Sequence, residues 1–300
     1  MRFLILGSQP TLSHQLEGRG HTVVVVRDPE RIADAFNEQV EAIVFGLAAP
    51  DTAAAIFRVQ QQIPFDQEPP LIVDTSPLVD WSLQSAFGED RVAVTAVLDE
   101  SLWAATDTTA GETFQKLTGA IPADSGRSLR WSGALPRMFA NVLPGVLDMS
   151  AEDVLQDTDL LTVELAALQE AQALLSLAQI DLMDLPGAPA ATLLRQAQRP
   201  LWLSRGKLRS IGTLFPATVR DELHNGNGQT TAPWLNGAVA ALGDSLGRFS
   251  PVNHTLALLA ADIATQRAPW SMYRGQPEMV RTAVRAAQGM SGSSAPPMLR

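Results

Sequence analysis

The stretch Trp234-Leu-Asn-Gly-Ala-Val-Ala-Ala-Leu-Gly-Asp-Ser-Leu-Gly-Arg-Phe-Ser-Pro-Val-Asn-His254 holds glycines and asparagines that a generic amphipathic helix does not require. Its large apolar side chains recur at helical spacing, at Leu235, Val239, Leu242 and Leu246. Gly247 suits the left-handed residue that follows a helix end, and Ser250-Pro251 suits an N-cap followed by a first-turn proline. Asn236 and Asn253 are expected to cap or bridge these turns. The stretch therefore predicts a helix, a tight turn and a second helix.

Short apolar runs in the first third of the chain predict a parallel sheet. They are rich in β-branched residues, as buried parallel strands are, and cover residues 2–7, 22–26, 42–46, 71–74 and 91–95. Helical stretches at 51–62 and 78–87 lie between them. This alternation is typical of a Rossmann-like, doubly wound α/β sheet. Residues 97–133 lose the pattern, so we expect them to form an irregular end of this domain and a connector.

After residue 133 the pattern becomes helical. Helical periodicity covers residues 134–148, 151–183, 189–214, 216–224, 233–246, 251–266 and 278–288. We expect a first domain over 1–133, an all-helical domain over 134–289 and a flexible tail over 290–300, where the composition is linker-like.

Composition narrows the function classes. The chain of 300 residues is 46% hydrophobic, carries a net charge of −10 and has a pI near 4.9. Binding of nucleic acid or of an anionic membrane needs a basic face, so the net charge argues against both partners. The chain has no cysteine and only 4 scattered histidines, so we expect no metal site. It shows no signal peptide and no apolar run of membrane-spanning length, which predicts a cytoplasmic protein.

The LNG, G and PVN pattern of the opening stretch, together with Leu135-Pro-Arg-Met-Phe-Ala-Asn-Val-Leu-Pro-Gly145, resembles the ketopantoate reductase family. Members of this family are NADPH-dependent enzymes that reduce a 2-oxo acid to a 2-hydroxy acid, a step of pantothenate biosynthesis. The resemblance implies a helical C-terminal domain of the 6-phosphogluconate-dehydrogenase-like kind and NADP(H) as cofactor. It also implies a small 2-oxo acid as substrate and a homodimer.

The first loop departs from the pattern that a dinucleotide needs. A dinucleotide-binding loop reads G-x-G-x-x-G/A, whereas here it reads Gly7-Ser8-Gln9-Pro10-Thr11-Leu12, with the first glycine alone retained. Gly7, Ser8 and Gln9 are the candidates for cofactor contact, and a plain strand-to-helix turn without a ligand is the alternative. If the loop binds nothing, the chain has no cofactor.

Two further positions bear on the cofactor. Arg27, with Arg31 nearby, lies where the family places a basic group for the 2′-phosphate of NADP; a solvated helix-capping cluster is the alternative. Ser76, in Asp74-Thr75-Ser76-Pro77, stands where the family has an asparagine-glycine pair near the nicotinamide.

The catalytic pattern is also altered. The family has K-x-x-x-N-x-x-x-N, a spacing that stacks three polar groups on one helix face; the three residues here are Arg137, Asn141 and Gly145. The family's lysine is a general acid, and a guanidinium at Arg137 is a poor proton donor near neutral pH. Asn141 is the candidate for substrate binding.

Two more positions complete the resemblance. Asp221 matches the aspartate of the family's Ser-Ser-Met-x-x-Asp segment and is a second substrate-binding candidate, for which we expect an ion pair with Arg137. Thr231 stands at the position of the family's functional glutamate. Two hypotheses follow: a degenerate relative with weak or no reductase activity, and an active NADPH-dependent reductase that uses a different proton donor.

Overall fold

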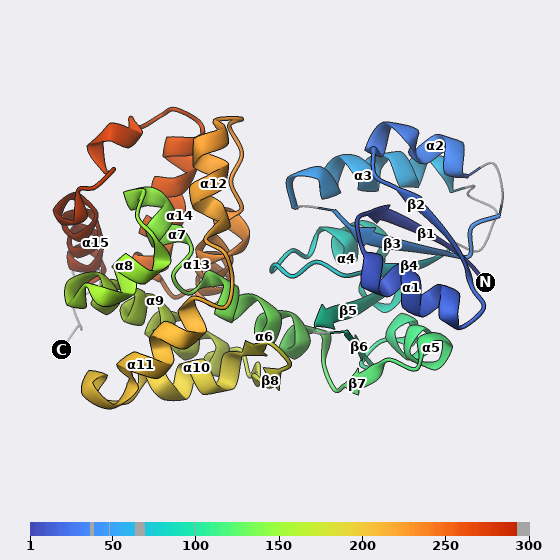
Figure 1. The fold of residues 1–300 in the computed structure, drawn as a ribbon, viewed down its shortest axis with the longest axis horizontal. Coiled ribbons are helices and arrows are strands. Elements are labelled where there is room, and N and C mark those ends of the chain that lie inside the picture. The colour runs from blue at the N-terminus through green and yellow to red at the C-terminus, as the bar shows by residue number, and fades with distance from the viewer. Residues whose placement is uncertain (37–38, 48, 64–69, 99, 293–300) are drawn as a thin grey trace, which may run out of the picture. The chain divides into compact units, whose positions relative to one another are not determined.

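The computed structural model describes residues 1–36, 39–47, 49–63, 70–98 and 100–292, and Figure 1 shows its fold. The chain divides into two compact units. The sheet unit comprises Met1–Gly133 with Leu185–Ala188, and the helical unit comprises Ala134–Asp184 and the chain from Pro189 onward. Helix α6 (Gly126–Met138) contains the boundary at Gly133.

A seven-stranded sheet forms the centre of the first unit. In space the strands follow the order β2-β1-β3-β4-β5-β6-β7, and all neighbours are parallel except β5 and β6. Their bounds are β1 (Arg2–Gly7), β2 (Thr22–Val26), β3 (Ala42–Gly46), β4 (Leu71–Asp74), β5 (Val92–Leu98), β6 (Ser101–Ala105) and β7 (Ile121–Ala123). The predicted doubly wound sheet is confirmed, and its first four strands have the predicted bounds.

Each face of the sheet has its own apolar core. Alternate residues of β1 point to opposite faces, so that Phe3 and Ile5 pack with residues of α1 (Pro10–Gly18) and α5 (Thr109–Thr118). Leu4 and Leu6 pack with residues of α2, α3 and α4 on the other face. The remaining helices of the unit are η1 (Pro29–Arg31), α2 (Ile32–Ala35), α3 (Ala49–Gln62), α4 (Ser82–Phe87) and η2 (Glu89–Arg91). β1 and β3 are neighbours whose connections run to opposite sides, so the topological switch point lies between them.

The expectation of an irregular segment over 97–133 is wrong. The segment contains β6, α5, β7 and the first half of α6. The Thr108 Oγ1 atom accepts a hydrogen bond from the Gly111 backbone N–H and caps α5, and Gly119 ends that helix in the left-handed conformation. The threonines and glycines that hid the pattern in the sequence are therefore caps of a regular helix.

The second unit is helical, as predicted. Its helices are the end of α6, α7 (Val142–Leu147), α8 (Ala151–Gln156), α9 (Thr158–Leu177), α10 (Ala190–Ala197), α11 (Leu201–Gly212), α12 (Thr218–Asn225), η3 (Ala232–Trp234), α13 (Asn236–Ser245), α14 (Pro251–Ala264), η4 (Trp270–Met272) and α15 (Pro277–Gly292). One small hairpin, β8 (Asp184–Leu185) with β9 (Ala188–Pro189), interrupts the predicted all-helical region. Residues 290–292 belong to α15 rather than to the predicted tail, and residues 293–300 lie outside the described residues.

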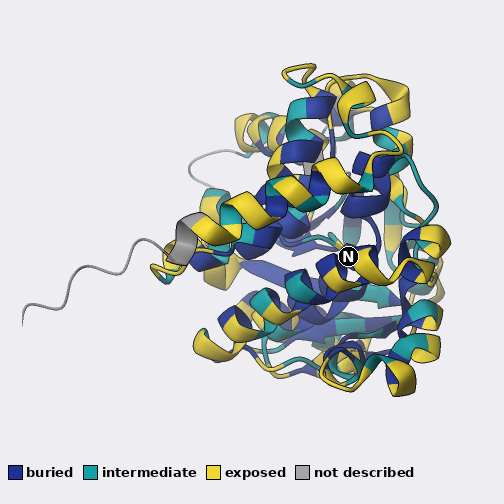
Figure 2. Ribbon diagram, turned by 90° about the vertical axis from the view of Figure 1, so that its left-hand side faces the viewer, coloured by how far each residue is buried: buried dark blue, intermediate teal, exposed yellow. Residues whose placement is uncertain are grey.

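Helix α9 is the core helix of this unit. It is the one described helix that is long and apolar enough to cross a membrane, and 56% of its most apolar window is buried within the protein. Burial accounts for its apolar composition. In contrast, α15 is buried along one face, at Val280 and Val284, and exposed along the other (Figure 2).

The opening stretch forms the predicted helix, turn and helix. α13 is followed by Gly247 at φ +64°, and α14 begins at Pro251. The two asparagines bridge these elements, because Asn236 Nδ2 donates to Asn253 Oδ1 at 2.9 Å. The carboxylate of Glu170, from α9, accepts the Val252 and Asn253 backbone N–H groups at 2.9 and 3.0 Å. A carboxylate from the core helix thus caps α14.

One carboxylate connects the end of α7 to α12 and to the turn that follows η4. Asp148, in the left-handed conformation at the end of α7, accepts hydrogen bonds from Arg220 Nε and His224 Nε2, both at 2.8 Å. It also forms an ion pair with Arg274, whose Nε lies 2.6 Å from Asp148 Oδ2. Burial raises the pKa of Asp148, but the hydrogen bonds from Arg220 and His224 and the charge of Arg274 outweigh it and lower the pKa overall. This network fixes α12 against α7.

The predicted helix over 134–148 is broken. α6 ends at Met138, Ala140 has φ +56°, and α7 begins at Val142. The Ala140 backbone N–H donates to Glu164 Oε2 at 3.2 Å, from α9. Glu164 Oε1 is buried and has no hydrogen-bond partner among the described residues. Burial raises the pKa of Glu164 to about 7, so at neutral pH much of this carboxyl is protonated.

We expect Glu164→Gln to remove a pH dependence of stability. The folded pKa, about 7, lies above the ordinary value of 4.5, so the stabilisation from proton binding is complete below pH 4.5 and is lost as the pH rises through 7. The shift corresponds to about 3 kcal/mol as an upper bound. Urea denaturation should give the wild type a lower free energy of unfolding at pH 8 than at pH 4.5. The free energy of unfolding of Glu164→Gln should not fall between these two pH values. Glu278→Gln, an exposed substitution on α15, is the control and should keep the wild-type loss.

Candidate functional site

The candidate cofactor site lies at the carboxyl ends of β1 and β3. Gly7 ends β1 with φ +99°, and a Cβ atom there would lie 2.5 Å from the Gly46 carbonyl oxygen. No other residue type fits this close approach of two strand ends. In doubly wound sheets the switch point is where a dinucleotide binds.

The side chain of Gln9 occupies this switch point. A Cβ atom added to Gly46 would overlap Gln9 Cγ and would lie 2.7 Å from Gln9 Nε2, so the glutamine side chain rests directly on the end of β3. Ser8 is exposed, and Pro10 supplies no N–H at the start of α1. Of the three predicted cofactor residues, Gly7 shapes the turn, Ser8 points to solvent and Gln9 fills the space above Gly46.

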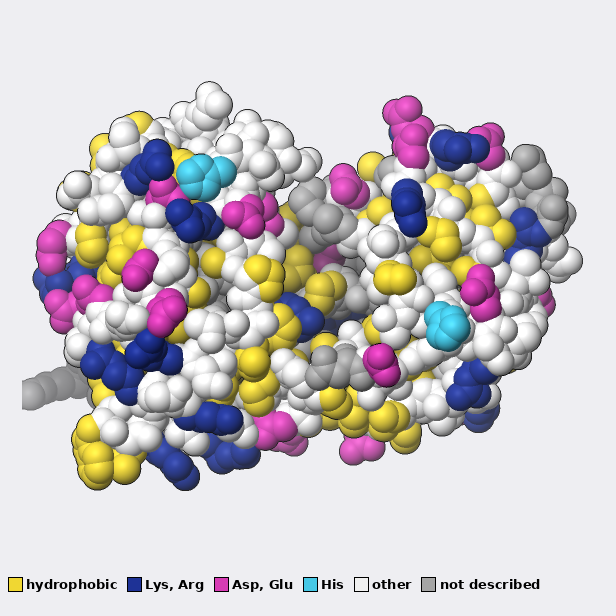
Figure 3. Space-filling model, viewed as in Figure 1, with side chains coloured by type: hydrophobic (Ala, Val, Ile, Leu, Met, Phe, Trp, Pro, Cys, Tyr) yellow, Lys and Arg dark blue, Asp and Glu magenta, His cyan; other side chains and the backbone are white. Residues whose placement is uncertain are grey.

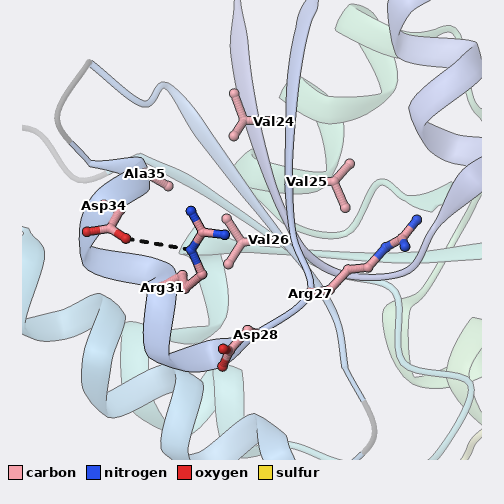
Figure 4. A pocket seen from close by; sticks show the side chains of 8 residues that line it. All are labelled: Val24, Val25, Val26, Arg27, Asp28, Arg31, Asp34 and Ala35. Carbon is pink, nitrogen blue, oxygen red and sulfur yellow. Dashed lines mark ion pairs between the residues drawn. The ribbon is translucent and has the colours of Figure 1, made fainter.

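Arg27 and Arg31 lie beside β2, at the edge of the sheet. They line a cavity of about 540 Å³ whose other walls are the valines of β2, Asp28, Asp34 and Ala35 (Figure 4). Arg31 Nε lies 3.7 Å from Asp34 Oδ2 within one exposed helical turn, while Arg27 points away from this pair (Figure 4). The two arginines therefore do not converge on one point.

An ion pair fills the region after β4, where Ser76 was expected to contact a nicotinamide. Arg130 Nη2, from α6, donates to Asp74 Oδ2 at 2.5 Å, and the two side chains are only 1% and 2% exposed. Arg130 Nη1 also donates to the Asp80 carbonyl at 2.6 Å, and the guanidinium lies 4.9 Å from the centre of the Trp81 ring. The Ser76 backbone N–H donates to Asp74 Oδ1 at 2.9 Å. Ser76 thus belongs to a turn organised by Asp74.

In the helical unit, Asn141 is part of the internal hydrogen bonding. Its Nδ2 donates to the Arg137 carbonyl at 3.0 Å and to Thr218 Oγ1 at 3.4 Å, and its Oδ1 accepts the Val219 backbone N–H at 3.1 Å. Asn141 is 4% exposed. Both atoms of its amide are therefore used to join α7 to the first turn of α12.

Gly145, the third residue of the altered pattern, lies where α7 contacts α12. A Cβ atom there would lie 2.6 Å from Val219 Cγ1 and 3.0 Å from the Arg220 backbone nitrogen. An asparagine, which the family pattern has at this position, would displace α12. The helix break at Ala140 also means that Arg137 and Gly145 are on separate helices, so the predicted single polar face is wrong.

The guanidinium of Arg137 lies 4.3 Å from the centre of the Phe215 ring. Burial lowers the pKa of Arg137 to about 10, so this group stays positively charged at neutral pH. Asp221 is exposed and, among the described residues, forms no ion pair, so the expected pair with Arg137 is absent.

Thr231, at the family's glutamate position, binds a glutamate of another helix. Its backbone N–H donates to Glu222 Oε2 at 2.7 Å and its Oγ1 donates to Glu222 Oε1 at 2.9 Å. The sequence reasoning missed this carboxylate and also missed Arg130. Arg130 is 56 residues from Asp74, Glu222 is 9 residues from Thr231, and no spacing pattern indicated either contact. The described residues contain no group of histidines and carboxylates that could hold a metal ion.

We expect Asp74→Asn to destabilise the protein by about 3–5 kcal/mol, because it leaves the buried charge of Arg130 without a counter-charge. The double variant Asp74→Asn/Arg130→Met should lose less free energy of unfolding than the sum of the losses of the two single variants. Glu112→Gln removes an exposed ion pair with Lys116 and should cost at most about 0.5 kcal/mol. Chemical denaturation measures all four variants, and an additive double variant would contradict the coupling.

We expect Gly145→Ala to destabilise the helical unit by about 1–3 kcal/mol, since the new methyl group meets Val219 and the backbone of α12. Gly206→Ala is the matched control. Gly206 lies within α11 with nothing near its Cβ position, so alanine there should stabilise by about 0.5–1 kcal/mol. Thermal unfolding followed by circular dichroism separates the two effects, and equal shifts would argue against close packing at Gly145.

Comparison with known proteins identifies the fold. No protein-family model matches the chain, and no curated protein matches its sequence. D-mandelate dehydrogenase, solved with NADH, has 12% sequence identity with a TM-score of 0.63, covering 89% of this chain and 99% of that one. A dimeric ketopantoate reductase from Staphylococcus aureus has 9% identity with a TM-score of 0.64, covering 89% and 100%. 2-Dehydropantoate 2-reductase from Geobacter metallireducens has 15% identity with a TM-score of 0.63, and the match covers 87% of this chain and 99% of that one.

These matches extend over nearly the whole of each solved chain, so both units and their order along the sequence are shared. The chain therefore has the fold of the ketopantoate reductases and of D-mandelate dehydrogenase.

Proposed function

We propose that this chain is a ketopantoate-reductase-like protein that keeps the reductase fold but has weak or no hydride-transfer activity. The observation that carries the proposal is the position of Gln9. Its side chain rests on Gly46 at the switch point between β1 and β3. A dinucleotide needs this space, because its pyrophosphate must approach the loop backbone and the helix N-terminus closely.

The start of α1 supports the same conclusion. Pro10 removes one of the N–H groups that a phosphate would use, and no side chain caps the helix at Gln9. The loop therefore offers fewer donors to a pyrophosphate than a glycine-rich loop does. NADP(H) remains the cofactor class that the fold favours, and its affinity here should be low.

The end of β4 provides a second argument. Asp74 and Arg130 fill this position with a buried ion pair, and the side chain of Ser76 accepts the Leu78 N–H at 3.2 Å within its own loop. A nicotinamide ring would meet these groups in place of an amide that can both donate and accept.

The residue at the family's lysine position is not a suitable proton donor. Arg137 is protonated up to a pKa of about 10 and does not release a proton at neutral pH. Lys116 pairs with Glu112 on α5, and Lys207 lies exposed on α11. The loss of a positioned general acid alone lowers a rate by about two to four orders of magnitude.

What the chain would bind instead follows from the residues that remain. A guanidinium such as that of Arg137 suits a carboxylate, so a 2-oxo acid or a related small acid is the ligand class that we propose for the helical unit. We also propose a homodimer, by analogy with the dimeric Staphylococcus aureus protein, and a cytoplasmic location.

The alternative is an active NADPH-dependent reductase with a different proton donor. The shared fold with D-mandelate dehydrogenase favours it, since that enzyme was solved with NADH. Fold alone does not decide between the two proposals, because activity depends on the residues of the site.

Titration with NADPH and NADH, followed by nicotinamide fluorescence, tests the proposal. We expect no saturable binding by the wild type up to millimolar cofactor. Gln9→Ala opens the space above Gly46 and should bring measurable binding, whereas Gln61→Ala, an exposed substitution on α3 of the same unit, should not. Tight wild-type binding with turnover of any 2-oxo acid would show that the proposal is wrong.

A further inference from the structure

The charge of this chain is unevenly distributed. The chain holds 22 basic and 32 acidic residues, yet the segment from Leu185 to Arg220 contains six of the basic residues and none of the acidic ones. This segment forms α10, α11 and the first turn of α12. Averaging over the whole chain hides a basic region in an acidic protein.

The same region exposes its largest apolar side chains. Trp202 is 81% exposed and Leu203 is 57% exposed, both in the first turn of α11. No other large hydrophobic side chain among the described residues is as exposed as Trp202. Figure 3 shows hydrophobic and basic side chains together over the part of the helical unit where α10 and α11 lie, at the lower left.

Helix α11 separates its two faces clearly. Ser204, Leu208 and Ile211 are buried and hold the helix in the unit. The opposite face carries exposed residues at intervals of three and four, which lie side by side on a helix. We call these residues, together with Arg199 in the connection just before the helix, the α11 outer face: Arg199, Trp202, Leu203, Gly206 and Lys207.

The two cations of this face are not engaged within the chain. Arg195 and Arg209, on either side, pair with Asp184 at 3.1 Å and with Glu152 at 2.6 Å. Among the described residues, neither Arg199 nor Lys207 has an ion pair or a side-chain hydrogen bond. Arg199 precedes the exposed Trp202 and Leu203, and Lys207 follows them.

We propose that the α11 outer face docks this protein on an anionic lipid bilayer. Trp202 would lie at the headgroup level with Leu203 inserted beside it, and Arg199 and Lys207 would contact the anionic headgroups. A nucleic acid would use the cations and stack on Trp202, but it offers no apolar environment to Leu203. The adjacent aliphatic side chain is what favours a bilayer, and the docking is weak and reversible because a single helical turn inserts.

Sedimentation of the full chain with lipid vesicles tests this docking. We expect association with vesicles of equal parts phosphatidylcholine and phosphatidylglycerol, little association with phosphatidylcholine alone, and weakening as salt is raised. The double variant Arg199→Gln/Lys207→Gln should bind about fivefold more weakly for each charge removed. Trp202→Ala should reduce association roughly tenfold, from the loss of buried apolar area.

Matched controls come from the sheet unit. Phe57→Ala removes an apolar side chain that is 62% exposed on α3, and Lys116→Gln removes a cation that is 72% exposed on α5; both should bind as the wild type does. Circular dichroism checks that every variant is folded. The proposal is overturned if the wild type ignores both kinds of vesicle, if the controls lose as much as the α11 variants, or if Trp202 supports binding to single-stranded RNA but not to vesicles. None of these outcomes depends on cofactor binding, so they leave the proposed function untouched.

Discussion

The buried ion pair between Arg130 and Asp74 is the interaction on which the carboxyl end of the sheet depends. Arg130 comes from α6 and binds the last residue of β4, the carbonyl of Asp80 and the face of Trp81. The loop after β4 is thereby held to α6. Burying one charge is costly unless the other is kept, so the two residues are constrained together. A chain with this arginine needs a carboxylate at the end of β4.

The other departures from the family pattern have local physical causes of the same kind. Gly145 is small because α12 crosses α7 at that point, and Thr231 binds the carboxylate of Glu222 on α12. Gln9 fills the space that a bare Gly46 leaves open. Each altered position is thus matched by a contact within its own unit. The altered positions therefore belong to a consistent packed arrangement within a stable fold.

How far the sequence predicts this structure depends on the range of the interaction. The strands were predictable, because a continuous apolar run such as residues 42–46 has few alternatives. The turn at Gly247 was predictable, because local backbone conformation sets its residue type. The order within 97–133 was missed, because its caps are threonines and glycines that also form loops. The break at Ala140 was missed as well, because its partner Glu164 lies on another helix. For the site, the sequence identified the altered positions, but the groups that compensate for them are contacts between distant residues.

The net charge of the whole chain is likewise a poor guide to local contacts. A net charge of −10 argues against anionic partners only when the charge is evenly spread over the surface. A partner at the surface responds to charges within about a Debye length, which is about 8 Å at physiological ionic strength. The region of α10 and α11 has no acidic residue of its own, and two of its cations are unengaged beside an exposed tryptophan. At that distance the unengaged Arg199 and Lys207 and the exposed Trp202 matter more than the net charge of the whole chain.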